Sequence, residues 1–171
     1  MTIESRLAEG LAAMSIALDA PAQAKLVAYL RLIEKWNKVH NLTAVREPAQ
    51  MVVLHLLDSL SLLPHLSGAR TLIDVGTGAG LPGIPLAVAR PDLAVTLLDS
   101  SHKKASFLRQ AKAELGLPNV EVACERVENW RPQAPFDLVV SRAFAELADF
   151  VSQARHLVAP AGAMLPMPRI I

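Results

Sequence analysis

The chain has 171 residues, of which 52% are hydrophobic and 19% are charged, with a formal net charge of +1. This composition excludes a disordered chain, and the length suits one domain with a sizeable core. The single cysteine, Cys124, excludes an internal disulfide and predicts a cytoplasmic location. We expect no signal peptide, and no apolar run reaches the roughly 18 residues of a membrane span.

Residues 1–67 are predicted to form a helical N-terminal region. One helix is expected to begin at Pro21 and a second near Pro48, because a proline is tolerated in the first turn of a helix. On the second helix, we expect His55 and Asp58 to form an exposed polar pair, three positions apart, opposite an apolar stripe. The apolar residues at helical spacing are Leu26, Leu30 and Ile33 in the first helix, and Val53, Leu56, Leu57, Leu60 and Leu63 in the second.

Residues 68–171 are predicted to alternate between strands and helices. A helix is expected at residues 101–115, with Ser100 or Ser101 as its cap and Gly116 at its end. Because the strands are almost continuously apolar, we expect a Rossmann-like α/β region whose mostly parallel sheet is covered on both faces. The short runs that predict strands are residues 71–75, 94–99, 120–125 and 136–141.

The loop "DVGTGAGLPG", residues 74–83, directly follows the first predicted strand, where α/β sheets bind their ligands. Its second half fits G-x-G-x-x-G, which is typical of dinucleotide sites. Two residues argue against a pyrophosphate: Asp74 would face it with a negative charge, and Pro82 has no N–H to donate. S-adenosylmethionine carries a sulfonium and an ammonium group, and Asp74 can bind the ammonium directly or through the loop.

Asp99 lies at the end of the second predicted strand. A carboxylate at this place accepts hydrogen bonds from ribose hydroxyls in enzymes that use NAD and in those that use S-adenosylmethionine. It can also cap the following helix beside Ser100, which is compatible with ligand binding. Together with Asp74 and the glycines, Asp99 indicates a site for a methyl donor.

Five stretches together resemble the bacterial small-subunit ribosomal RNA guanine-N7 methyltransferases, a family also called glucose-inhibited division protein B. The resemblance covers about residues 26–160 and implies the class I S-adenosylmethionine-dependent methyltransferase fold. It implies methyl transfer to N7 of guanine 527 in the 530 loop of 16S rRNA, free or in the 30S subunit. We also expect a monomer that contacts no membrane. The stretches are "WNKVHNLTAV" (36–45), "HLLDSL" (55–60), "IDVGTGAGLPGIPLA" (73–87), "TLLDS" (96–100) and "FDLVVSRAFA" (136–145).

The resemblance and the loop chemistry together assign candidate site residues. Arg142 is the one catalytic candidate, either closing the donor pocket or binding guanine O6 or a phosphate, and Lys103, Lys104 and Phe144 are candidates for RNA binding. The alternatives are a surface arginine, a solvated helix face and a core aromatic. No general base is expected, because guanine N7 attacks with a free lone pair, and no metal is expected. The candidates for cofactor binding are Asp74, Gly76, Gly78, Leu81, Asp99, Val127, Glu128 and Arg142.

Two places depart from the family pattern. Leu54 stands where relatives often carry a basic residue, which removes one expected phosphate contact. After Gly162 the chain reads "AMLPMPRII", and Pro166 and Pro168 cannot donate hydrogen bonds to a sheet, so we expect the C-terminal strands to be incomplete. The alternative function is therefore a catalytically inactive remnant that binds donor or RNA, and an NAD-dependent oxidoreductase is a third hypothesis.

Overall fold

The computed structural model describes residues 1–168; residues 169–171, at the end of the second predicted region, lie outside this part. Its sheet has the strand order β3-β2-β1-β4-β5, and all neighbouring strands run parallel. The four predicted strands are confirmed, the third ending one residue early, and a fifth follows at the edge beside β4. The strands are β1 (Thr71–Val75), β2 (Ala94–Asp99), β3 (Val120–Cys124), β4 (Phe136–Ser141) and β5 (Val158–Pro166).

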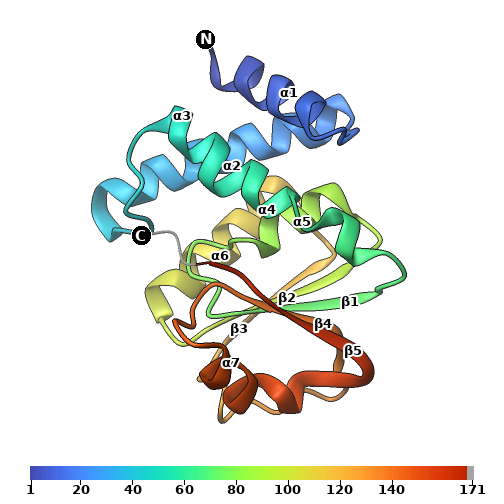
Figure 1. Cartoon of the computed structure of the whole chain (residues 1–171). Coiled ribbons are helices and arrows are strands. Elements are labelled where there is room, and N and C mark those ends of the chain that lie inside the picture. The colour runs from blue at the N-terminus through green and yellow to red at the C-terminus, as the bar shows by residue number, and fades with distance from the viewer. Residues whose placement is uncertain (169–171) are drawn as a thin grey trace.

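Helices cover both faces of this sheet, which explains its nearly continuous apolar strands. The helices that precede β1, together with α5 and α6, lie on one face, and α7 lies on the other (Figure 1). The predicted Rossmann-like arrangement is confirmed. The helices are α1 (Ile3–Ala13), α2 (Ala20–His40), α3 (Pro48–Met51), α4 (Asp58–Leu60), α5 (Gly83–Ala89), α6 (His102–Leu115) and α7 (Leu147–Ala154).

Local sequence signals explain where the two longest helices, α2 and α6, begin and where α6 ends. The Asp19 carboxylate caps α2 by accepting a hydrogen bond from Ala22 N at 2.8 Å. Ser101, one of the two predicted caps, caps α6 by accepting from Lys104 N at 3.3 Å. Gly116 ends α6 in the left-handed conformation, with φ of 62°.

The second predicted helix forms, but its middle is π-helical over Val52–Leu57, between α3 and α4. The wider turn changes which side chains face the core. Val53, predicted to be in the apolar stripe, is 40% exposed, whereas His55, predicted to be exposed, is only 1% exposed. Both predictions were wrong because they assumed an uninterrupted α-helical period.

This helix also extends the core of the protein. By length and composition alone, Pro48–Leu66 is apolar enough to cross a membrane. Here, however, it contacts α1, and Leu56 and Leu60 are fully buried. One continuous apolar cluster joins it to Leu30 of α2 and to Leu72 of β1, so the N-terminal helices pack directly against the sheet. A second, smaller cluster fills the space between the sheet and α7.

Candidate functional site

The loop after β1 is a tight turn that only glycine permits at several positions. Gly76, Gly78 and Gly80 have φ of 65°, 60° and 94°. A Cβ at Gly76 would lie 2.4 Å from Ala143 Cβ, whereas a Cβ at Gly78 would meet no atom within 4 Å. The turn is therefore packed against the end of β4 at Gly76 and open at Gly78.

Asp74 holds this loop in place from beneath. Its side chain is fully buried, and its Oδ2 accepts hydrogen bonds from Thr77 Oγ1 at 2.7 Å and from Gly83 N at 2.8 Å. Burial raises the pKa of Asp74 to about 7, although these two hydrogen bonds oppose the shift. Asp74 Oδ1 is buried as well and has no hydrogen-bond partner within residues 1–168. Both predicted ways for Asp74 to bind a ligand, directly or through the loop, stay predictions.

Asp99 links the same loop to the start of α6. Its Oδ2 accepts from Gly78 N at 2.9 Å and its Oδ1 accepts from Ser101 N at 2.9 Å. The predicted capping role of Asp99 was wrong, because Ser101 caps α6 and Asp99 binds the N–H of that cap residue instead of an N–H of the helix. Each carboxylate oxygen has a further lone pair, so Asp99 can still accept hydrogen bonds from a ligand.

A hollow of about 220 Å³, which we call the strand-end hollow, lies outside the carboxyl ends of β1 and β2. Its lining also includes Ala143 and Phe144, which follow β4, and the strand order reverses between β1 and β4. Parallel α/β sheets bind ligands outside the carboxyl ends of their strands at such a reversal. Four of the predicted cofactor-binding residues line the hollow: Gly76, Asp99, Val127 and Glu128. The remaining lining residues are Val75, Leu98, Ser100, Glu125 and Arg126.

A second hollow, of about 400 Å³, lies on the side of the N-terminal helices; we call it the helix-side hollow. Gly76 and Ala143 line both hollows, so the two adjoin at these residues. The structure thereby divides the predicted cofactor site, because Gly78, Leu81 and Arg142 line only this second hollow. Its other lining residues are Leu42, Thr43, Ala44, His55, Thr77, Ala79 and Lys104.

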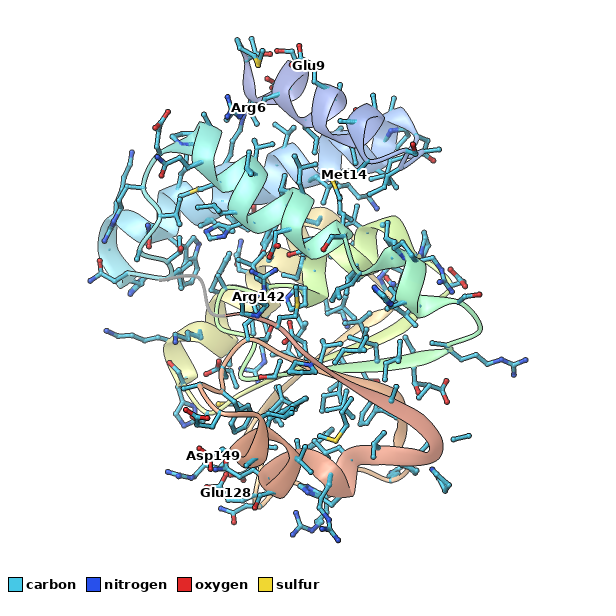
Figure 2. The ribbon with its side chains drawn as sticks, viewed as in Figure 1. Arg6, Glu9, Met14, Glu128, Arg142 and Asp149 are labelled. Atoms are coloured by element: carbon cyan, nitrogen blue, oxygen red, sulfur yellow. The ribbon has the colours of Figure 1, made fainter. Side chains whose placement is uncertain are left out.

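Arg142 follows β4 and is only 8% exposed, so the alternative of a surface arginine was wrong. It forms an ion pair with Asp58 of α4. Within residues 1–168, its Nε and Nη1 have no hydrogen-bond partner. Figure 2 shows Arg142 between the helical layer and the sheet, with Glu128 farther away, near α7. A buried guanidinium with free donors is suited to bind acceptor oxygens of a ligand.

The predicted RNA-binding residues do not form one group. Lys104 is half-buried and lines the helix-side hollow, whereas Lys103 is exposed and lies outside both linings. Phe144 lines the strand-end hollow and packs against Phe150, with ring centroids 5.5 Å apart. This contact agrees with the alternative that Phe144 is a core aromatic.

Several polar contacts around the site could not be found from the sequence. The Tyr29 hydroxyl of α2 donates to Ala79 O of the glycine loop at 2.5 Å. Thr43 Oγ1 lies 2.9 Å from His55 Nε2. Burial lowers the pKa of His55 to about 4, so the ring is neutral at pH 7. Tyr29 fits the helical periodicity of α2 as an ordinary core residue, and only the folded chain shows its polar partner.

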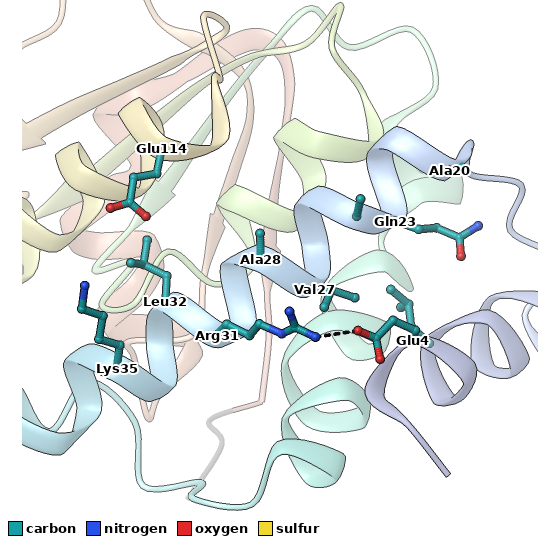
Figure 3. A pocket seen from close by; sticks show the side chains of 11 residues that line it. Glu4, Ala20, Gln23, Val27, Ala28, Arg31, Leu32, Lys35 and Glu114 are labelled. Carbon is teal, nitrogen blue, oxygen red and sulfur yellow. Dashed lines mark hydrogen bonds and ion pairs between the residues drawn. The ribbon is translucent and has the colours of Figure 1, made fainter.

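A larger hollow of about 640 Å³ lies along α2, between α1 and α6 (Figure 3). Its lining is mainly aliphatic, and the Arg31–Glu4 ion pair at 2.7 Å is part of it. It contains no residue of the glycine loop and lies away from the strand ends. We therefore place the chemistry at the two adjoining hollows. Within residues 1–168, no group of three or more His, Cys, Asp and Glu side chains is placed to hold a metal ion.

Comparison with known proteins decides the family. A family model for rRNA small subunit methyltransferase G matches residues 22–168. The chain belongs to this family. It is 57% identical over 165 residues to ribosomal RNA small subunit methyltransferase G of Methylobacillus flagellatus, covering 96% of this chain and 80% of that protein. It is also 57% identical to the Nitrosospira multiformis protein of the same name, covering 93% of this chain and 73% of that one.

Solved structures show the same fold at low sequence identity. A putative S-adenosylmethionine-dependent methyltransferase of Methanococcus maripaludis aligns with a TM-score of 0.59 and 18% identity, covering 82% of this chain and 62% of that one. A methyltransferase of Thiobacillus denitrificans, solved with S-adenosylhomocysteine, aligns with a TM-score of 0.53 and 17% identity, covering 80% and 53%. The predicted class I methyltransferase fold and the predicted family are both confirmed.

Proposed function

We propose that this chain transfers a methyl group from S-adenosylmethionine to N7 of guanine 527, in the 530 loop of 16S rRNA. The observation that carries the proposal is the meeting of two hollows at Gly76 and Ala143. A methyl transfer needs the donor and the acceptor in adjoining sites, with the reacting atoms aligned. Membership of the rRNA small subunit methyltransferase G family supports ribosomal RNA as the acceptor.

The strand-end hollow suits the donor, S-adenosylmethionine, which supplies an electrophilic methyl group when bound. Asp99 offers carboxylate lone pairs where ribose hydroxyls need acceptors. Val127 and Glu128 form the neighbouring wall. Gly78 N donates to Asp99 Oδ2 and so fixes this carboxylate at the hollow. Arg142, with its free donors at the second hollow, is suited to bind a carboxylate oxygen or the acceptor base.

The chemistry of N7 explains why the site needs no general base. Guanine N7 has an in-plane lone pair and no proton to remove, so the residues contribute alignment and exclusion of water. Methyltransferases that act on exocyclic amines of bases commonly carry [DN]-P-P-[YF] after the fourth strand. Here that place reads Ser141-Arg142-Ala143-Phe144. The residues therefore favour a ring nitrogen over an amine.

The positive charge at the start of α6 supports RNA as the partner. Lys103 and Lys104 lie in the first turn of this helix, and Lys104 lines the helix-side hollow. Lysines at such a place can bind phosphates of an RNA whose target base enters the hollow. We propose that the chain acts as a monomer in the cytoplasm, where small ribosomal subunits are assembled.

Methyl transfer to ribosomal particles tests this proposal. Small subunits that lack the modification are incubated with radiolabelled S-adenosylmethionine, and N7-methylguanine is located by chemical cleavage of the rRNA at the modified base. We expect label at a single guanine of the 530 loop. Label on another base, or on a guanine amine, would contradict the assignment. Binding of S-adenosylhomocysteine without any transfer would favour the inactive remnant, and a thermal shift with NADH alone would favour an oxidoreductase.

A further inference from the structure

Residues 42–44 lie in the connection between α2 and α3, which has no helix or strand structure, yet hydrogen bonds fix them. Asn37 Nδ2 donates to Thr43 O at 3.1 Å, and Asn37 Oδ1 accepts from Thr43 N at 3.0 Å. The Arg46 guanidinium donates to Asn37 O at 3.1 Å and to Asn41 Oδ1 at 2.7 Å. Both backbone polar groups of Thr43 are thus held by one side chain, which is itself part of α2.

The Thr43 hydroxyl connects this segment to the buried His55. It accepts a hydrogen bond from Val45 N at 3.2 Å and lies 2.9 Å from His55 Nε2. A hydroxyl that accepts from Val45 still has its own proton to donate, and the Nε2 of a neutral imidazole can accept it. Burial lowers the pKa of His55 to about 4, which agrees with a neutral ring.

The charges around the helix-side hollow indicate what it can receive. Leu42, Ala44 and Leu81 give it an apolar lining, and His55 is uncharged. The charge of Arg142 is already paired with Asp58, which leaves Lys104 as the one unpaired cation in the lining that the structure describes. A phosphate would need more unpaired positive charge, whereas a flat, uncharged base suits such a lining.

We propose that the helix-side hollow receives the target base and that Thr43 is a positioning residue. Through its contacts with Asn37 and His55, Thr43 holds residues 42–44 in place as one wall of this hollow. The inference rests on the proposed function, because a methyl acceptor must lie beside the donor at Gly76 and Ala143. Thr43 does not react with the base. Its hydroxyl keeps the wall at the distance that places N7 in line with the methyl group.

The test compares Thr43→Val, which keeps the shape and removes the hydroxyl, with Thr43→Ser, which keeps the hydroxyl. The matched control is Thr71→Val, at the start of β1, where the hydroxyl accepts from Asp137 N at 2.9 Å and Thr71 lines neither hollow. For each variant we measure the S-adenosylhomocysteine affinity, the affinity for small ribosomal subunits, and kcat and KM of methyl transfer. Thermal unfolding is followed as well.

For Thr43→Val, we expect kcat to fall by about tenfold or more, because a small misplacement of the reacting atoms slows the transfer strongly. The affinities for S-adenosylhomocysteine and for subunits should stay within about twofold of wild type. Thr43→Ser should recover kcat to within about threefold. Thr71→Val should lose similar thermal stability and keep its kcat.

Three outcomes would overturn the inference. An unchanged kcat in Thr43→Val would mean that the wall does not position the base. A parallel loss of donor affinity would place Thr43 in the donor site, and a loss of kcat in Thr71→Val of similar size would reduce the effect to stability. If wild type itself transfers no methyl group to subunits, the proposed function fails, and the inference fails with it.

Discussion

Asp58 of the N-terminal helical layer forms an ion pair with Arg142 at the end of β4. The Arg142 side chain is 9% exposed and the Asp58 side chain 47%, so the pair lies at the boundary between interior and solvent. It joins the helices to the part of the sheet that carries the site. The carboxylate also compensates a guanidinium that has few other partners.

We expect Asp58→Asn to lower the free energy of unfolding by about 1–2 kcal/mol, because it leaves a buried guanidinium without its counter-charge. The loss is no larger because Asp58 is exposed to solvent, which weakens the ion pair. The measurement is urea denaturation of Asp58→Asn, Arg142→Met and the double variant. The double variant should lose less than the sum of the single losses, by about 1 kcal/mol. Strict additivity would show that the pair contributes nothing to stability.

Gly78→Val should abolish donor binding. Gly78 has φ of 60°, which valine does not readily adopt, and its N–H donates to Asp99 Oδ2 at the strand-end hollow, so the strained turn would displace this carboxylate. The matched control is Gly116→Val, which also has a positive φ, 62°, and no atom within 4 Å of its Cβ, but ends α6.

Both glycine variants should lose about 1–2 kcal/mol of stability from the strained backbone. In titration calorimetry, Gly78→Val should lose more than about tenfold in S-adenosylhomocysteine affinity, whereas Gly116→Val should keep it within about twofold. Equal affinities in both variants would mean that the glycine loop is only a turn.

Asp74 should make stability depend on pH. Its pKa is raised from 3.8 to about 7 in the folded protein, so the folded state holds this proton more tightly than the unfolded state. Its contribution to stability is therefore fully present below the unfolded pKa and is lost as pH rises through the folded pKa. Because asparagine does not titrate, Asp74→Asn removes this loss of stability at higher pH.

We expect the free energy of unfolding of Asp74→Asn, relative to that of wild type, to increase between about pH 4 and pH 7 by up to about 1.4 kcal/mol for each pH unit. Urea denaturation at several pH values measures the difference. The control is Asp137→Asn, because hydrogen bonds from Arg70 N and Thr71 N lower the pKa of Asp137. Its difference from wild type should stay constant between about pH 4 and pH 7 and should change, in the opposite direction, only below about pH 4, because a carboxyl with a lowered pKa is already ionised above that pH. A flat difference for Asp74→Asn would mean that Asp74 is ionised in the fold at all these values.

Replacing Lys103 and Lys104 with alanine should weaken RNA binding in a salt-dependent way. If both lysines bind phosphates, the slope of log K against log salt should flatten by up to about two units, because each neutralised phosphate releases a counterion. Donor affinity should not change. The comparison is the double variant of Arg109 and Lys112, which removes the same charge from elsewhere on α6. If both double variants flatten the slope equally, the effect comes from net charge alone. If the slope of the Lys103 and Lys104 variant is unchanged, these two lysines belong to a solvated helix face.

The sequence by itself determined the strands, the main helices and the position of the loop after β1. Short apolar runs, the capping residue Ser101 and closely spaced glycines act through neighbours in the chain, so they can be recognised locally. The family motifs predicted S-adenosylmethionine as the methyl donor and ribosomal RNA as the acceptor, because they include residues in and around that loop.

The tertiary structure alone decided how the site is assembled. The π-helical segment places His55 in the interior, and Asp74 is fully buried, where it accepts a hydrogen bond from Gly83 N of the loop. Asp58 forms an ion pair with Arg142, and the predicted cofactor residues that line a hollow lie in two adjoining hollows instead of one. Local patterns indicate which face of an element is apolar, but they do not specify which polar groups from distant segments will meet. That pairing depends on how the helices pack against the sheet, because a buried polar group must find its partner wherever the folded chain brings one.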